Sequence, residues 1–203
     1  MKKMIVSLFA LAGLLVPSVL SAQTVELKSE GLEPAYVENI LNRSQKIVDS
    51  LDIHDVATEH NVRNIIANRY FLLNKIHEEN KDNAERRDAE LYKHHFELVA
   101  DLSLYIDDEQ IEDVKDGMTY GVVPKTYQAH LDMIPSLKAE EKAQILAWLK
   151  EAREFAMDAE NSNKKHAWFG KYKGRINNWL SARGYDLVKE REGWYKRIKE
   201  NKK

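Results

Sequence analysis

Apolar residues along the chain recur three and four positions apart, a spacing that places them on one face of an α-helix. A first stripe follows Pro34, and proline is well suited to the first turn of a helix. The members of this stripe are Tyr36, Ile40, Ile47, Val48 and Leu51. Those of the next stripe are Val62, Ile65, Ile66, Tyr70, Leu73 and Ile76. Both stretches are predicted to be amphipathic helices.

Six further helices are predicted downstream. Shorter stripes mark three of them, at 91–105, 111–118 and from near Pro124 to 134, and two more are expected near 163–182 and 186–200. Between these lies the most continuous stripe, preceded by Ser136 as the expected N-cap. Its members are Ile145, Trp148, Leu149, Ala152, Phe155, Ala156 and Ala159. No comparable run alternates with period two, so the predicted fold is all-α, a multi-helix bundle of about seven or eight helices.

The first 22 residues follow a different pattern. Two lysines precede an apolar run over 5–16, and the stretch 17–22 ends in small residues. This order is typical of a secretory signal peptide. The run is about a dozen residues long, too short for the roughly 20 that span a bilayer, so no stable membrane anchor is expected. We predict cleavage after Ala22 and export to the periplasm or the medium.

Composition narrows the remaining possibilities. Residues 23–203 have the length of one domain, and 43% apolar residues favour a folded chain. The chain has no cysteine, which excludes disulfides and thiolate metal sites. His94 and His95 are adjacent and would point about 100° apart on a helix, so the pair alone cannot chelate one ion. The acids of 107–116 lack the glycine of a calcium loop and are better explained as acids that favour the first turns of a helix. We therefore predict one helical domain with no metal and no cofactor.

Charge is uneven along the chain. The stretch 164–203 holds 13 Lys and Arg against 4 Asp and Glu, whereas 23–163 holds 16 against 29. The basic helices can dock on the acidic body, or part of their surface can receive an acidic ligand. Nucleic acid is disfavoured because the chain without residues 1–22 is net negative. An acidic polysaccharide is the better candidate.

The most informative segment is 164–180. Helical spacing places most of its aromatic residues on a core face, and beside that face lies a strip of donors with Trp168 on its border. The strip consists of Lys164, Lys171, Arg175 and Asn178. An indole ring stacks on sugars, while these donors suit hydroxyls and carboxylates. We predict that the strip holds a uronic acid.

Three other features near this strip leave alternatives open. Gly170 and Gly174 permit close approach, either of a packed helix, which we favour, or of a ligand. His166 is either a base or a solvated side chain. In the loop 117–127, Tyr120 and Tyr127 either face a cleft or are buried in a tight turn.

Three runs carry a resemblance to a known family: DGMTYGVVPKTY at 116–127, AWLKEAREFAMD at 147–158 and HAWFGKYKGRINN at 166–178. They closely resemble domain-of-unknown-function family 3826, exported proteins of Gram-negative bacteria that degrade glycans. The resemblance covers the chain beyond the predicted signal peptide. It implies export and a sugar ligand, with pectin-type polysaccharides as context, and it brings no catalytic residues.

Three functions are compatible with these observations. The first is a carbohydrate-binding or accessory protein for acidic oligo- or polysaccharides. The second is a lyase, in which Lys171 or Arg175 neutralises a uronate carboxylate while His166, Tyr120 or Tyr127 abstracts the adjacent proton. The third is an envelope scaffold or adaptor that binds a protein partner through an amphipathic helix. A cleft shared by 117–127 and 164–178 would favour the first two.

Export is directly testable. The processed protein should begin at or within a few residues of Gln23, because the apolar run and the small residues that follow it specify cleavage there. Intact-mass measurement of protein from the envelope fraction checks this. A full-length chain retained in the cytoplasm would contradict it.

Overall fold

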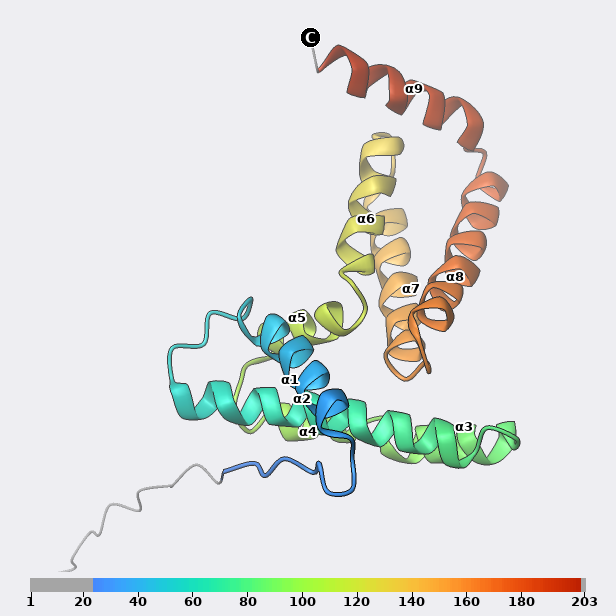
Figure 1. Cartoon of the computed structure of the whole chain (residues 1–203). Helices are drawn as coiled ribbons and strands as arrows, with labels where there is room; N and C mark the ends of the chain where they lie inside the picture. Colours follow the sequence, from blue (N-terminus) through green and yellow to red (C-terminus); the bar gives the residue numbers. More distant parts are fainter. Residues whose placement is uncertain (1–23, 202–203) are drawn as a thin grey trace, which may run out of the picture.

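The computed structural model describes residues 24–201, which form helices joined by short turns without any strand (Figure 1). The helices are α1 (Pro34–Val48), α2 (Val56–Glu79), α3 (Ala84–His94), α4 (Glu97–Leu102), α5 (Asp108–Met118), α6 (Val122–Met133), α7 (Ala139–Met157), α8 (Ser162–Ala182) and α9 (Leu187–Glu200). The all-α prediction is confirmed. The predicted signal peptide lies outside the described residues.

The described chain has nine helices because the third predicted helix is divided into α3 and α4. The two buried residues of that stripe, Leu98 and Leu102, both lie on α4, whereas α3 buries no residue. At the break, the side chain of His95 turns towards Asp158 at the end of α7, with Nδ1 2.6 Å from a carboxylate oxygen. The contact between His95 and Asp158 therefore lies at the point where the predicted helix over 91–105 is divided.

Local signals account for most helix starts. Pro34 is the first residue of α1, and Pro124 lies in the first turn of α6. Five other helices begin after an Asp or Asn whose side chain accepts a backbone N–H of the first turn, at Asp55, Asn83, Asp107, Asn161 and Asp186.

The predicted N-cap Ser136 is wrong. Helix α7 begins at Ala139, and Lys138 takes the N-cap position, where its backbone N–H donates to the Glu141 carboxylate over 2.9 Å. Leu137, next to Ser136, precedes the helix and is buried in a hydrophobic core.

The first hydrophobic core is formed by α1, α2, α4 and α5. An extended segment at 24–32 lies along it, held by amides of α2. Asn61 accepts the Val25 N–H, Asn64 donates to the Val25 carbonyl, and Asn68 pairs with the backbone of Glu26 and Lys28, each over 2.8–2.9 Å. These side-chain amides take the place of a neighbouring β-strand, because they satisfy backbone N–H and C=O groups of the extended segment.

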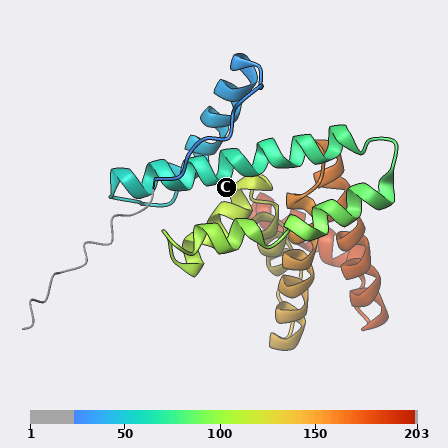
Figure 2. The ribbon, with the colours of Figure 1, turned by 90° about the horizontal axis from the view of Figure 1, so that it is seen from below.

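The second hydrophobic core is formed by α6, α7 and α8, with α9 at its edge. Helices α7 and α8 make an antiparallel hairpin whose closed end lies towards α2 and α3 (Figures 1 and 2). The two cores are separate clusters, and the chain passes from one to the other at the turn between α5 and α6. No helix within residues 24–201 is long and apolar enough to cross a membrane.

The packing of α5 on α1 yields a stability prediction. A Cβ at Gly117 would lie 2.9 Å from the buried Ile47 side chain, whose branch point is only 3.4 Å away. Gly117→Ala should therefore destabilise the protein by about 1 to 3 kcal/mol. Gly170 on α8 meets nothing within 4 Å. Gly170→Ala should be neutral or stabilise by up to about 1 kcal/mol through helix propensity. Denaturant unfolding of both variants checks the pair; equal stabilities would contradict it.

Candidate functional site

Helix α8 carries most of the predicted binding residues. Its core face consists of Phe169, Tyr172, Ile176 and Leu180, all buried as the helical spacing predicted. Trp168 and Trp179 are half-buried at the edges of this face. Both indole rings therefore keep an exposed side while their packing holds them in place.

Helix α7 adds aromatic rings beside them. Phe155, predicted to belong to the apolar stripe of α7, is 47% exposed and stacks on Trp168 with ring centroids 4.6 Å apart. Trp148 meets Trp179 edge to face at 5.2 Å. These four rings line one face of the hairpin together with three cations, and we name this surface the α7–α8 ridge. Its cations are Lys171, Arg175 and Arg183.

Each cation of the ridge lies over an aromatic ring. Lys171 is 5.0 Å from the centre of Trp168, Arg175 is 4.5 Å from Trp148, and Arg183 is 4.9 Å from Trp179. Arg175 also pairs with Glu151 at 3.6 Å, with both side chains about half exposed. Cation–π contacts orient Lys171 and Arg175 while leaving donors for a ligand, whereas Arg183 is also paired with Glu141 at 2.7 Å.

Burial and hydrogen bonding raise the pKa of Tyr172, whose phenol lies next to the ridge. Tyr172 has its pKa raised to about 12 by burial, and next by a hydrogen bond to Glu151. Glu151 therefore contacts both Tyr172 and Arg175. An acidic ligand would meet this carboxylate beside Arg175, and that of Glu140 beside Arg183.

The structure divides the predicted site residues into groups. Trp168, Lys171 and Arg175 share the ridge, and Lys164 and Asn178 are exposed on the same side of α8. Tyr120 and His166 stack with ring centres 5.5 Å apart. Since they are two residues apart, His166 and Trp168 point about 160° apart around the helix. Tyr127 is half-buried against the second core and joins neither group.

Gly170 and Gly174 do not serve helix packing. A Cβ at either position would meet nothing within 4 Å among the described residues. The favoured close-packing interpretation is wrong, because this side of α8 faces away from α7 and the core.

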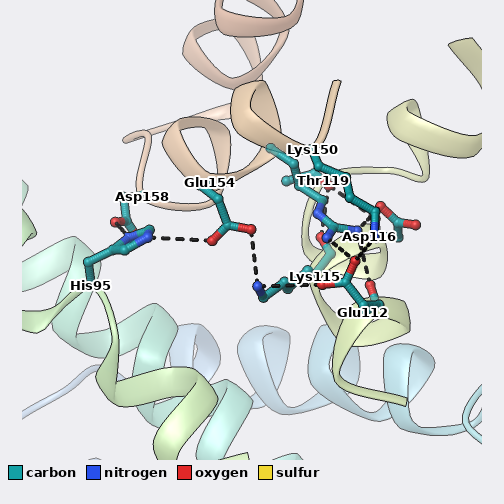
Figure 3. A network of polar contacts seen from close by, with 9 residues as sticks. His95, Glu112, Lys115, Asp116, Thr119, Lys150, Glu154 and Asp158 are labelled. Atoms are coloured by element: carbon teal, nitrogen blue, oxygen red, sulfur yellow. Dashed lines mark hydrogen bonds and ion pairs between the residues drawn. The ribbon is translucent and has the colours of Figure 1, made fainter. Parts of the chain in front are cut away.

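Figure 3 shows a polar network that the sequence did not predict, where the hairpin end meets the first core. Asp158 accepts hydrogen bonds from Arg69 on α2 and from His95 between α3 and α4. His77 contacts the Asp158 backbone carbonyl at 2.8 Å, and Arg69 also donates to the His94 carbonyl at 2.7 Å. The end of α7 is thus held by α2 and by the turn between α3 and α4.

The network continues along α7 to α5. Arg153, 1% exposed, pairs with Glu112 and Asp116, each at 2.7 Å. Lys115 bridges from α5 to Glu154 on α7 at 3.1 Å (Figure 3). Glu112 and Asp116, assigned from the sequence to the first turns of a helix, instead lie further along α5 and face α7. Their i, i+4 spacing was the available signal, but nothing local identified Arg153 as the partner.

This arrangement shifts two pKa values strongly. Hydrogen bonds to Asp158 and then Glu154 raise the pKa of His95 to about 9, against the opposing effect of burial. For Glu112, burial favours the neutral acid, but hydrogen bonds and charges from Lys150 and Arg153 outweigh it and lower the pKa to about 2. Both groups are therefore charged near neutral pH and form ion pairs between helices. We name this network of ion pairs around Asp158 and Arg153 the ionic joint.

A groove lies apart from the α7–α8 ridge, and Arg69 of the polar network is among its lining residues. It has a volume of about 740 Å³ between the segment 24–32, α2 and α4. Its lining mixes apolar residues such as Val25 and Leu72 with the acids Glu78, Glu79 and Asp101. It contains none of the predicted binding residues, and its acids disfavour an acidic ligand. No group of three or more His, Asp or Glu suited to hold a metal ion occurs within residues 24–201.

These features define an all-helical protein that presents aromatic rings and cations on one helical hairpin. The chain belongs to DUF3826, a family of proteins of unknown function, whose model matches residues 37–87 and 80–200. The family resemblance seen in the sequence is thus confirmed. No curated protein matched the chain.

The joint yields a pH prediction. The pKa of His95 is near 6.5 in an unfolded chain and about 9 in the fold, so its stabilisation is complete below pH 6.5 and is lost as the pH rises through 9. In His95→Gln, the fall in unfolding free energy between pH 6 and 9.5 should shrink by about 1 to 3 kcal/mol. Denaturant titrations at both pH values check this. His54→Gln is the control, since His54 is 87% exposed. An unchanged pH profile in His95→Gln would contradict the prediction.

Proposed function

We propose that this protein binds an acidic oligo- or polysaccharide along the α7–α8 ridge, as a carbohydrate-binding or accessory component of a polysaccharide-degrading system. The observation that carries the proposal is the alternation of rings and cations on this ridge. Trp148 and Phe155 lie seven residues apart on α7, and Trp168 and Arg175 seven apart on α8. On α7 a ring therefore recurs after about two helical turns, and on α8 a cation follows a ring after the same interval.

Ring packing supports a sugar ligand. Half-buried indoles offer flat apolar faces to sugar C–H groups, and Phe155 and Trp148 hold them in position. Little side-chain freedom remains to be lost on binding, which preserves affinity.

Charge supports an acidic sugar. Lys171 and Arg175 lie beside one carboxylate, that of Glu151. The third cation, Arg183, is already paired with Glu141 at 2.7 Å and with Glu140 at 3.8 Å, so Lys171 and Arg175 carry the argument. Arg175 shares only one contact with Glu151, at 3.6 Å, and its remaining guanidinium donors suit a carboxylate.

Geometry supports binding over the lyase alternative on the ridge. A lyase needs the group that neutralises the carboxylate and the base within reach of one sugar. Here Lys171 and Arg175 lie on the ridge, whereas His166 points about 140° away from Lys171 and about 180° away from Arg175 around α8. Tyr120 stacks on His166. A protein partner on the ridge remains an outcome of the binding test below.

The location of the protein is part of the proposal. The pattern of lysines, apolar residues and small residues over 1–22 supports export. An exported protein meets polysaccharides in the periplasm or the medium, which agrees with an acidic sugar ligand.

Arg175→Ala should weaken binding of galacturonate oligosaccharides roughly ten- to a hundredfold, because it removes a charge-assisted contact worth about 1.5 to 3 kcal/mol. Its melting temperature should stay near that of wild type, since the side chain is 52% exposed. Calorimetric titration with thermal melting measures both. Lys196→Ala, an exposed cation on α9, is the charge-matched control and should bind normally.

Trp168→Ala separates stacking from charge. It should reduce affinity for both galacturonate and neutral galactose oligosaccharides, whereas Arg175→Ala should affect only the acidic ones. Unchanged affinity of stable Arg175→Ala and Trp168→Ala variants would remove the ridge as the site. A failure of every sugar to bind would leave a protein ligand as the occupant and overturn the proposal.

A further inference from the structure

The turn between α5 and α6 has a strained backbone that positions an aromatic ring. Tyr120 has φ of +63°, a left-handed conformation that is uncommon for a residue with a side chain, and Gly121 follows at +62°. The Tyr120 carbonyl accepts a hydrogen bond from Lys125 Nζ at 2.8 Å. The ring is 43% exposed and stacks on His166 at the start of α8. Such strain is commonest where a side chain must be held for function.

Arg43, which is exposed on α1, and Tyr70 of the first core approach the same place. Arg43 on α1 lies 5.5 Å from the ring centre of Tyr70 on α2. Burial raises the pKa of Tyr70 to about 12, Arg43 acts against this rise, and Tyr120 adds to it. The two phenols and the guanidinium are therefore electrostatic neighbours.

Lys165 brings a buried cation to this group. It is 5% exposed, and its Nζ donates to the Met157 carbonyl at 3.0 Å. Its pKa is lowered to about 8 by burial, with Asp158 opposing the shift and Arg43 and Arg69 adding to it. In the described part of the chain no carboxylate forms an ion pair with Lys165, since Asp158 is occupied by Arg69 and His95.

Buried charge is costly unless an opposite charge compensates it. Around Lys165 the nearby guanidinium of Arg43 adds positive charge and forms no ion pair within residues 24–201. Tyr70 and Tyr120 offer hydroxyl groups, and His166 offers a ring nitrogen. An oxyanion would meet two cations and several hydrogen-bond donors here.

We propose that Arg43, Lys165 and His166, with Tyr70 and Tyr120, form a second binding site, which takes a small oxyanion such as a carboxylate or a phosphoryl group. The site lies where α1, α2, the α5–α6 turn and α8 converge. It is distinct from the α7–α8 ridge, because none of its residues belongs to the ridge, and Arg43, Tyr70 and Tyr120 come from α1, α2 and the α5–α6 turn. Of its residues, Arg43, Tyr120 and His166 are exposed, whereas Tyr70 and Lys165 are buried.

The test is calorimetric titration of the processed protein, at constant ionic strength, with sodium phosphate, sodium galacturonate and neutral galactose. One or both anions should bind saturably, while galactose should not bind at this site. Arg43→Gln should weaken anion binding tenfold or more, since its exposed side chain contributes charge without supporting the core. Lys165→Met should abolish binding. Arg175→Ala, the ridge variant, should leave phosphate binding unchanged.

The outcomes separate the sources of the anion. Binding of phosphate alone indicates a phosphoryl ligand. Binding of galacturonate alone indicates a carboxylated sugar when Arg43→Gln weakens it and Arg175→Ala does not. If Lys165→Met fails to fold, Arg43→Gln decides. The absence of saturable binding by either anion at about 10 mM, or equal binding in wild type and Arg43→Gln, overturns the proposal. Neither result bears on the ridge, which is tested separately by oligosaccharides and Arg175→Ala.

Discussion

The buried ionic joint between the two hydrophobic cores determines how the rest of the structure is arranged. Arg153, 1% exposed, pairs with Glu112 and Asp116 on α5, and Asp158 pairs with Arg69 and His95. Removing one member of such a pair leaves an uncompensated buried charge, at a cost of about 3 to 5 kcal/mol. Apolar packing tolerates sliding, whereas these directional contacts define one position of the hairpin against the first core.

This joint also explains where ligands can reach the protein. Because the closed end of the α7–α8 hairpin is fastened to α2, α3 and α5, the ridge remains on a free face of the hairpin. The same fastening brings Lys165, near the start of α8, close to Arg43 on α1. The ionic contacts of the hairpin end thus leave the α7–α8 ridge exposed and bring together the cations Arg43 and Lys165 of the proposed second site.

Helical period alone identified much of the ridge. Trp168, Lys171 and Arg175 are three and four residues apart, so any helix through 164–180 places them on one side. The period also placed Phe169, Tyr172, Ile176 and Leu180 in the core. It failed for Phe155, predicted within the stripe of α7 but 47% exposed. It also failed for Gly170 and Gly174, because small size permits packing without showing that a neighbour is present.

The sequence by itself determined the all-α class and most helix positions and buried faces, since these depend on residues three or four apart and on local caps. It is also the sole basis for the predicted signal peptide. Only the tertiary structure decided which charges pair, because Arg69 and Asp158 are 89 residues apart and no local pattern marks them as partners. The Tyr120–His166 stack and the position of Lys165 arise in the same way, from the docking of distant helices.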